Sequence, residues 1–487
     1  MQNPNISDIS DRGSQWREEL RGAMTAKERT AIPRVRMPEL PADYRVTTLS
    51  AEVNQGLSSE QAVLEATRCL DCPDPQCIKG CPVGINIPGF IKNVQRGRSD
   101  LAAQVLRATS ALPAVCGRVC PQERQCESKC IYHKMHKEPV AIGYLERFAA
   151  DSVSEAPQEQ PVQPVGIKIA VAGSGPAGLS FAGDMAARGF DVTVFEALHE
   201  IGGVLKYGIP EFRLPNAIVD REIKALEARG VTFVPDTVIG KTLSVDDLLN
   251  DGFKGIFVAS GAGLPRFMGI PGENLIGVMS SNEYLTRINL MGAGRPGFDT
   301  PVAHGKVAAI IGGGNTAMDS ARTARRMGSE KVYIVYRRSE AEMPARLEEI
   351  KHAKEEGIEL MTLSNPVSYT GDERGHVTAM QVHRMELGEP DESGRRSPVP
   401  IPGAIDTVPV DLVIVSVGVS PNPLIPDAVK GLEVSHRGTI TVNNDTMQSS
   451  INFMYAGGDI VRGGATVILA MGDGRRAAEG MAAALLP

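Results

Sequence analysis

Two glycine-rich turns, each placed between an apolar strand and a helix, constrain the fold of this 487-residue chain most. The first lies in "GIKIAVAGSGPAGLSFAGDMAARGFDVTVFEA" and the second in "GKVAAIIGGGNTAMDSARTARRMGSEKVYIVYRR". Each segment has the pattern of a buried strand, a tight turn, a helix and a second strand. The sequence therefore predicts an α/β protein that contains two βαβ units.

The first turn has the spacing of a dinucleotide-binding loop of the Rossmann type. Glycines permit a tight turn and close approach of the backbone to a pyrophosphate, whose charge the helix N-terminus stabilises. Glu196 ends the second strand, where a carboxylate can bind ribose hydroxyls and would repel a 2′-phosphate, which suits FAD or NAD. The predicted residues of the turn are Gly173, Gly175, Pro176, Ala177 and Gly178.

Later features favour FAD at this first site. The segment "EIGGVLKYGIPEFRLP" places Gly203 and Leu205 shortly after Glu196, where the backbone can approach a flavin. Asp459, in "YAGGDI", follows a predicted strand and can bind ribitol or ribose hydroxyls, although an ordinary turn or capping residue is the alternative. The helix predicted after "GGAT" would stabilise negative charge on a reduced flavin.

The second turn predicts an NADPH site. The next strand ends in Arg337 and Arg338 instead of an acidic residue, and guanidinium groups match a 2′-phosphate. A solvated basic strand end is the alternative interpretation. The residues predicted to hold the nucleotide at this turn are Gly312, Gly314, Asn315, Thr316 and Ala317.

All eight cysteines lie in one short region, which favours a metal or redox cofactor over disulfides in a reducing compartment. Eight thiolates suit two [4Fe–4S] clusters, and ferredoxins interleave their ligand runs. Structural zinc and disulfides are the alternatives, and Glu146 is an alternative ligand that would leave Cys116 free. The predicted ligand sets are Cys69, Cys72, Cys77 and Cys130 for one cluster, and Cys81, Cys116, Cys120 and Cys126 for the other.

Composition excludes several classes of function. The net charge of −7 and the lack of a long Lys/Arg block argue against nucleic acid as the main partner. The polar start "MQNPNISDIS" has no apolar core of a secretory signal, and no apolar run reaches membrane-spanning length. We therefore expect a soluble, cytoplasmic protein.

The motifs together resemble the small (beta) subunit of NADPH-dependent glutamate synthase, the large subunit of ferredoxin-NADP transhydrogenase, and the N-terminal half of dihydropyrimidine dehydrogenase. The resemblance runs from about Met37 to the end, through "RCLDCPDPQCIKGCPVGINIPGFI", "CGRVCPQERQCESKC", "VAIGYLERF", "GIPEFRLP" and "YAGGD". In this family NADPH reduces FAD, and FAD passes single electrons through two clusters to a partner. The dihydropyrimidine dehydrogenase branch has a glutamine ligand at the position that matches Glu146.

The expected organisation is a helical iron–sulfur domain at 1–150, a linker at 151–165, an FAD domain at 166–277 and 416–487, and an NADPH domain at 278–415 inserted in it. The expected function is electron delivery for glutamate synthesis from 2-oxoglutarate and glutamine, with a large glutamate synthase subunit or another redox protein as partner. A subunit of an electron-bifurcating NADH-dependent ferredoxin-NADP transhydrogenase is the alternative. A non-enzymatic electron-transfer subunit and a zinc-scaffolded reductase are rivals from other classes. No catalytic acid, base or nucleophile is predicted, because the cofactors carry the chemistry.

Overall fold

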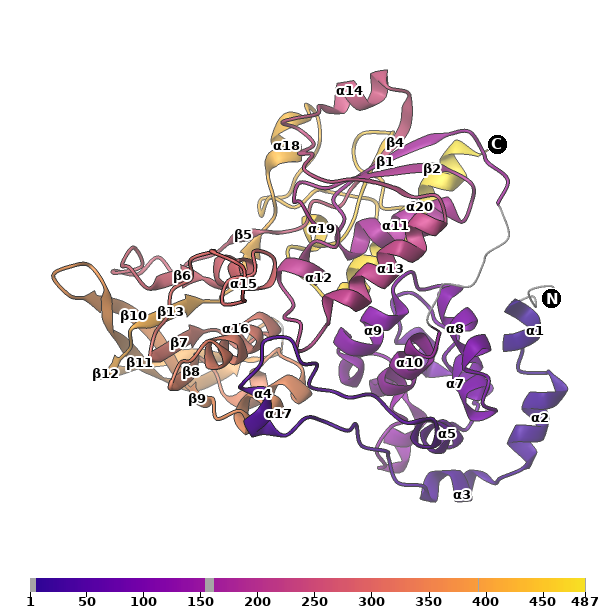
Figure 1. Ribbon diagram of the computed structural model, residues 1–487, viewed down its shortest axis with the longest axis horizontal. Helices are drawn as coiled ribbons and strands as arrows, with labels where there is room; N and C mark the ends of the chain where they lie inside the picture. Colours follow the sequence, from indigo (N-terminus) through magenta and orange to yellow (C-terminus); the bar gives the residue numbers. More distant parts are fainter. Residues whose placement is uncertain (1–5, 154–161, 393, 487) are drawn as a thin grey trace.

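The computed structural model describes residues 6–153, 162–392 and 394–486. A helical domain, coloured indigo to purple in Figure 1, lies beside two α/β units. Part of the predicted linker, residues 154–161, lies outside the described residues. The helices of the first 153 residues are α1 (Ile6–Ser10), α2 (Gln15–Gly22), α3 (Ala26–Ala31), α4 (Ala42–Arg45), α5 (Ser59–Thr67), α6 (Gln76–Lys79), α7 (Ile87–Gln95), α8 (Ser99–Arg107), α9 (Pro113–Val119) and α10 (Ile142–Asp151).

The first βαβ unit belongs to a five-stranded parallel sheet with strand order β15-β4-β1-β2-β3. Its strands are buried because helices cover both faces, as parallel sheets require. Helix α11 follows the first glycine-rich turn and packs against the long C-terminal helix α20. The bounds are β1 (Lys168–Ala172), α11 (Pro176–Ala186), β2 (Asp191–Phe195), α12 (Val204–Tyr207), α13 (Asn216–Ala228), β3 (Thr232–Val234), α14 (Val245–Asn250), β4 (Phe253–Val258), β15 (Met454–Ala456), α19 (Asp459–Arg462) and α20 (Val467–Leu485).

The second βαβ unit belongs to a separate parallel sheet with strand order β6-β13-β7-β8-β9. Because the chain returns to β15 of the first sheet afterwards, this unit is inserted in the first, as predicted. The domain limits themselves remain a prediction. The bounds are β6 (Val278–Ser280), α15 (Ser281–Asn289), β7 (Val307–Ile311), α16 (Asn315–Arg326), β8 (Lys331–Tyr336), α17 (Leu347–Glu355), β9 (Glu359–Thr362) and β13 (Leu412–Val415).

Three antiparallel strands extend the inserted unit, and their hairpin projects at the left of Figure 1. Two further short strands pair with each other, and a short helix contributes Ile425 to a core of the first unit. None of these elements is predicted from the sequence. They are β10 (Ser364–Gly371), β11 (Val377–Pro390) and β12 (Arg396–Pro409), with β5 (Leu264–Pro265), β14 (Val419–Ser420) and α18 (Leu424–Ala428).

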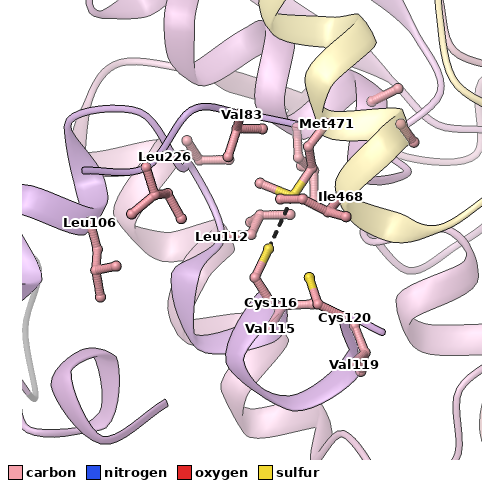
Figure 2. Close-up of a cluster of buried hydrophobic side chains, with 14 of the residues drawn as sticks. Val83, Leu106, Leu112, Val115, Cys116, Val119, Cys120, Leu226, Ile468 and Met471 are labelled. Carbon is pink, nitrogen blue, oxygen red and sulfur yellow. Dashed lines mark hydrogen bonds between the residues drawn. The ribbon is translucent and has the colours of Figure 1, made fainter. Parts of the chain in front are cut away.

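One continuous apolar core joins the helical domain to the first α/β unit. It includes Leu145 of α10, Leu179 of α11 and Met471 of α20. Figure 2 shows the junction, where the Cys116 Sγ of α9 lies 3.4 Å from the Met471 Sδ. The helical domain is therefore packed on the unit that carries the first nucleotide turn.

The N-terminal arm, residues 6–45, contacts two parts of the molecule. Its first three helices lie along the helical domain (Figure 1). Further along, Arg45 pairs with Glu355 of α17 at 2.7 Å, and Glu39 pairs with Lys351 of the same helix at 3.1 Å. The arm thereby connects the helical domain to the inserted unit. Among the described residues, no helix combines the length and apolarity that crossing a membrane requires.

Candidate functional site

A cavity of about 1090 Å³ is lined by residues of both α/β units. It receives residues from both glycine-rich turns and from the helical domain. The N-termini of helices from both units reach this cavity, because each glycine-rich turn follows the carboxyl end of a parallel strand. Parallel α/β sheets bind ligands at that edge. The predicted residues that line it are Gly173, Gly175, Pro176, Ala177, Glu196, Gly203, Asn315, Thr316 and Asp459.

The first turn leaves its helix N-terminus open. Gly175 is the N-cap of α11, and no side chain accepts a hydrogen bond from the first turn of that helix. A Cβ on Gly175 would meet no atom within 4 Å, whereas a Cβ on Gly178 would lie 2.0 Å from the Gly173 carbonyl oxygen. The structure thus needs Gly178 for packing and leaves space at Gly175, where a phosphate can accept amide hydrogen bonds.

Glu196 is held in place by backbone donors. Its carboxylate accepts from the Ser174 amide at 2.8 Å and from the Leu198 amide at 2.9 Å. The side chain is buried at the wall of the cavity. Asp459, which also lines the cavity, is half-buried and accepts from the Ala465 amide at 2.9 Å. Burial raises the pKa of Asp459. Two carboxyl groups therefore face the cavity where ribose or ribitol hydroxyls could bind.

The second turn has the same open geometry. Gly314 is the N-cap of α16 without a side-chain cap, and a Cβ there would meet no atom within 4 Å. The Asn315 Oδ1 accepts from the Arg346 amide at 2.9 Å, which orients Asn315 beside the turn. The remaining predicted turn residues, Gly312, Gly314 and Ala317, do not line the cavity, nor do Gly178 and Leu205 of the first unit.

The two predicted arginines differ in their surroundings. The Arg338 side chain is buried, and it donates to the Arg396 carbonyl oxygen at 2.7 Å and to Asp391 at 2.6 Å in the β11–β12 hairpin. Arg337, at the end of β8, is exposed. Neither residue lines the cavity. Arg337 thus presents the guanidinium that faces solvent, while Arg338 anchors the hairpin.

Sequence reasoning missed four charged residues in the cavity wall, which are Arg213, Glu283, Arg287 and Asp319. Arg213, in the loop before α13, donates to both carboxylate oxygens of Asp319 at 2.7 and 2.6 Å. Burial raises the pKa of Asp319 to about 6, against the lowering effect of Arg213. The pair joins the first unit to α16 of the second. Arg213 lies in "GIPEFRLP" and Asp319 lies in the segment of the second glycine-rich turn, and these two stretches are far apart in the chain.

The electrostatic interactions between the cysteines sort them into two groups, and the ligand sets remain a prediction. In the outer group, defined as Cys69, Cys72, Cys77 and Cys130, all four side chains are partly exposed. Burial, together with the charges of Cys69 and Cys130, raises the pKa of Cys72 to about 11. The same causes raise the pKa of Cys77. Crowded thiols with raised pKa values favour a bound cation, which stabilises thiolates.

The inner group is defined as Cys81, Cys120 and Cys126, of which Cys120 and Cys126 are buried, and two further candidate ligands, Cys116 and Glu146, accompany it. Burial raises the pKa of Cys81 to about 11, and the charges of Glu146 and Cys120 act in the same direction. Cys116 lies at the junction with α20. The described part of the chain thus offers this group five candidate ligands for four places.

Glu146 is a buried carboxyl group with an open oxygen. It is 5% exposed, and its Oε1 has no hydrogen-bond partner among the described residues. Burial raises the pKa of Glu146 to about 8. A buried carboxyl oxygen without a partner is costly unless a ligand satisfies it. This observation fits a metal cluster bound beside Cys81, Cys120 and Cys126.

The inner group adjoins the nucleotide cavity. Val119 and Pro121, the two neighbours of Cys120, both line the cavity wall. None of the outer cysteines does. Of the two cysteine groups, the inner one therefore adjoins the space that both glycine-rich turns line.

Two family models match this chain. Residues 45–158 match "Dihydropyrimidine dehydrogenase domain II, 4Fe-4S cluster", and residues 167–474 match "Pyridine nucleotide-disulphide oxidoreductase". The NADPH complex of FprA from Mycobacterium tuberculosis has a TM-score of 0.55 at 21% identity and covers 66% of this chain and 85% of that one. This likeness confirms the predicted α/β fold class.

Curated relatives are similar over nearly the full length. The glutamate synthase [NADPH] small chain of Azospirillum brasilense is 37% identical over 88% of this chain and 90% of its own. The corresponding Escherichia coli K12 chain is 36% identical over 92% and 97%. The beta subunit of the NADP(+)-dependent formate dehydrogenase of Moorella thermoacetica is 39% identical, but this chain spans 59% of its length.

These similarities agree with the 4Fe–4S domain, the two nucleotide turns and the shared cavity. They identify an NADPH-dependent flavin and iron–sulfur oxidoreductase. The chain belongs to the family of NADPH-dependent glutamate synthase small subunits.

Proposed function

We propose that this chain takes electrons from NADPH and delivers them through FAD and two [4Fe–4S] clusters to a partner that makes glutamate from 2-oxoglutarate and glutamine. The cavity carries the proposal, because one space receives both nucleotide turns and the neighbours of Cys120. When bound, FAD would convert hydride transfer into single-electron steps, and the clusters would carry those electrons.

The residues of the chain bind and orient the nucleotides. The open N-termini of α11 and α16 would each donate amides to a pyrophosphate. Glu196 would accept from ribose hydroxyls of FAD, held in register by Ser174 and Leu198. Arg337 would pair with the 2′-phosphate of NADPH, since Arg338 is already engaged with Asp391. No acid, base or nucleophile of the chain is required.

The cysteine groups would each hold one cluster. The outer group supplies four thiolates. For the inner group we favour Glu146 over Cys116 as the fourth ligand, because the Glu146 Oε1 is buried without a partner while Cys116 contacts Met471. The proximity of Val119 and Pro121 to the cavity supports electron entry at the inner cluster, and the partial exposure of the outer cysteines supports exit there.

The partner would dock over the outer group. The segment that flanks Cys130 is rich in exposed basic residues, which are Lys129, His133, Lys134, His136 and Lys137. An acidic surface on the partner would complement it. The proposal is tested by anaerobic purification from the native cell with identification of stoichiometric partners by mass. A partner of amidotransferase size supports glutamate synthesis.

A different electron acceptor is the second candidate function. The similarity to a formate dehydrogenase beta subunit and to the NADPH-Fe(3+) oxidoreductase beta subunit of Geobacter sulfurreducens, 35% identical, favours it, because relatives of comparable identity are named for other reactions. A small flavin and iron–sulfur partner in the same purification would support a transhydrogenase and would contradict glutamate synthesis. NADPH-dependent reduction of ferricyanide by the isolated chain would persist in either case.

A further inference from the structure

The N-terminal arm forms part of the outer cysteine site. Arg17 of α2 is 2% exposed, and it donates to both carboxylate oxygens of Asp71, at 2.5 and 3.3 Å. Asp71 is fully buried and lies in the loop between Cys69 and Cys72. Arg21 adds a bond to the same carboxylate at 2.8 Å, and the Arg12 Nε donates to the Asp71 carbonyl oxygen at 3.0 Å.

The loop that the arm contacts has an unusual backbone. Asp71 has a φ of 52°, in the left-handed region that a residue other than glycine adopts when its surroundings enforce it. The three arginines of the arm hold both the side chain and the carbonyl group of Asp71 in that conformation. These contacts span 50 or more residues of sequence. The two flanking cysteines therefore owe part of their positions to the arm.

The surroundings of this loop carry excess positive charge. Lys92, fully buried in α7, donates to the Cys69 carbonyl oxygen at 2.6 Å. Arg29 of the arm is 3% exposed, donates to the Thr67 carbonyl oxygen at 2.7 Å and lies within electrostatic range of Cys69. Three buried cations, Arg17, Arg29 and Lys92, thus stand against the one buried carboxylate of Asp71.

Other charges near the outer group do not cancel this excess. Arg68 pairs with Glu65 at 2.6 Å, and both side chains are buried, so that pair adds no net charge. Glu127, the nearest acid on the side of Cys130, pairs with Arg34 at 2.9 Å. Positive charge near an iron–sulfur cluster favours the reduced form, because reduction adds an electron to the cluster.

We propose that the N-terminal arm is an electrostatic component of the outer cluster site, in which Arg17 acts through Asp71 as a positioning residue that raises the reduction potential of that cluster. The family models begin at residue 45, so these arginines lie outside both matched regions. The inference rests on the proposed function, since it requires the outer group to hold a cluster.

The test is an anaerobic redox titration of the full-length holoprotein, followed by electron paramagnetic resonance. Iron and acid-labile sulfide are measured in every preparation, and Cys72→Ser identifies the outer signal. We expect Arg17→Gln to lower the ratio of reduced to oxidised outer cluster about tenfold at fixed solution potential, a shift of about 59 mV for a one-electron couple. The inner signal should not move.

Two further variants separate charge from structure. Arg17→Lys keeps the charge, and we expect it to restore most of the potential. Arg21→Gln, at a side chain 22% exposed, should lower the potential of the outer cluster in the same direction. This variant provides the test if Arg17→Gln does not retain its iron. Arg98→Gln, at the exposed Arg98–Asp100 pair, is the matched control and should leave the outer potential unchanged.

An unchanged outer potential in iron-replete Arg17→Gln and Arg21→Gln would overturn the proposal. Equal shifts of both clusters, or failure of Arg17→Lys to restore the potential, would also overturn it, since either result indicates general loosening. A wild-type protein with zinc and no acid-labile sulfide would instead contradict the proposed function. The metal analysis therefore distinguishes the two failures.

Discussion

Arg213 and Asp319 form a buried ion pair across the wall of the nucleotide cavity, with the Arg213 Nη1 2.7 and 2.6 Å from the two Asp319 oxygens. The Arg213 Nε lies 3.1 Å from Glu349, which also pairs with Arg322. The pair fixes the loop after α12 against α16 of the inserted unit. The two glycine-rich turns are thereby held at one shared cavity.

Loss of Arg213 should destabilise the protein strongly. Arg213→Met leaves Asp319 and Glu349 buried without their shared cation, and breaking a buried pair typically costs about 3–5 kcal/mol. Adding Asp319→Leu should recover part of the loss. Urea unfolding of the cofactor-loaded protein measures both changes. Arg98→Met, in an exposed pair, is the control and should cost less than about 1 kcal/mol. If Arg213→Met also lowered the free energy of unfolding by less than about 1 kcal/mol, the Arg213–Asp319 pair would not stabilise the fold.

Glu356 should contribute acid-sensitive stability. Its carboxylate accepts two hydrogen bonds from each of Arg322 and Arg326, with donor–acceptor distances of 2.6 to 3.0 Å. Burial opposes ionisation, but the two arginines outweigh it and lower the pKa of Glu356 to about 2. A lowered carboxyl pKa stabilises the fold above the unfolded pKa near 4.5, and the contribution disappears as the pH falls towards 2.

At pH 7 the ionised Glu356 should contribute about 3 kcal/mol to the free energy of unfolding, because each unit by which its pKa is lowered is equivalent to about 1.4 kcal/mol. Glu356→Gln should lower stability at pH 7 and flatten the dependence of unfolding free energy on pH between 4.5 and 2. Glu359→Gln on β9, an exposed residue, provides the comparison. An unaltered pH dependence in Glu356→Gln would contradict the assigned ion pairs.

Arg337 should determine the preference for NADPH over NADH. A charge-assisted hydrogen bond contributes about 1.5–3 kcal/mol, so Arg337→Ala should raise the KM for NADPH about tenfold or more and leave the KM for NADH unchanged. Steady-state reduction of ferricyanide provides the measurement. Arg338→Ala should instead destabilise the β11–β12 hairpin through loss of the Asp391 contact. If Arg338→Ala alone changes the nucleotide preference, the roles of the two residues are reversed.

The fourth ligand of the inner cluster can be identified by iron content. Glu146→Ala should lose about half of the iron, the share of one of two [4Fe–4S] clusters, whereas Cys116→Ala should retain both. The reason is the buried and unpartnered Glu146 Oε1. Iron and sulfide analysis with spectroscopy of the reduced protein gives the measurement, and Cys81→Ala should behave like Glu146→Ala. Iron loss in Cys116→Ala with retention in Glu146→Ala would restore the all-cysteine ligand set.

The fold class and the cofactor chemistry could be predicted from the sequence because they depend on local patterns. Strand, turn and helix follow one another directly at Gly173 and at Gly312, and the cysteine spacing lies within one short region. The hairpin of β11 and β12 was not predicted, because its alternation of polar and apolar residues lies in a Pro-rich segment. The sequence predicts Arg337 and Arg338 alike as nucleotide-binding residues. Only the structure shows that Arg338 pairs with Asp391 of the β11–β12 hairpin, a contact that the sequence pattern does not reveal.

The sequence by itself determined that this chain is an α/β oxidoreductase with two nucleotide turns and eight clustered cysteines, because short-range spacing encodes each motif. Only the tertiary structure decided which motifs meet. Arg213 reaches Asp319 across 106 positions, and Arg17 reaches Asp71 across 54. Such contacts depend on how parallel sheets and helices pack. A buried charge is costly unless it is paired, and its partner can come from a distant part of the chain. The shared cavity and the cationic surroundings of the loop between Cys69 and Cys72 are therefore properties of the folded molecule alone.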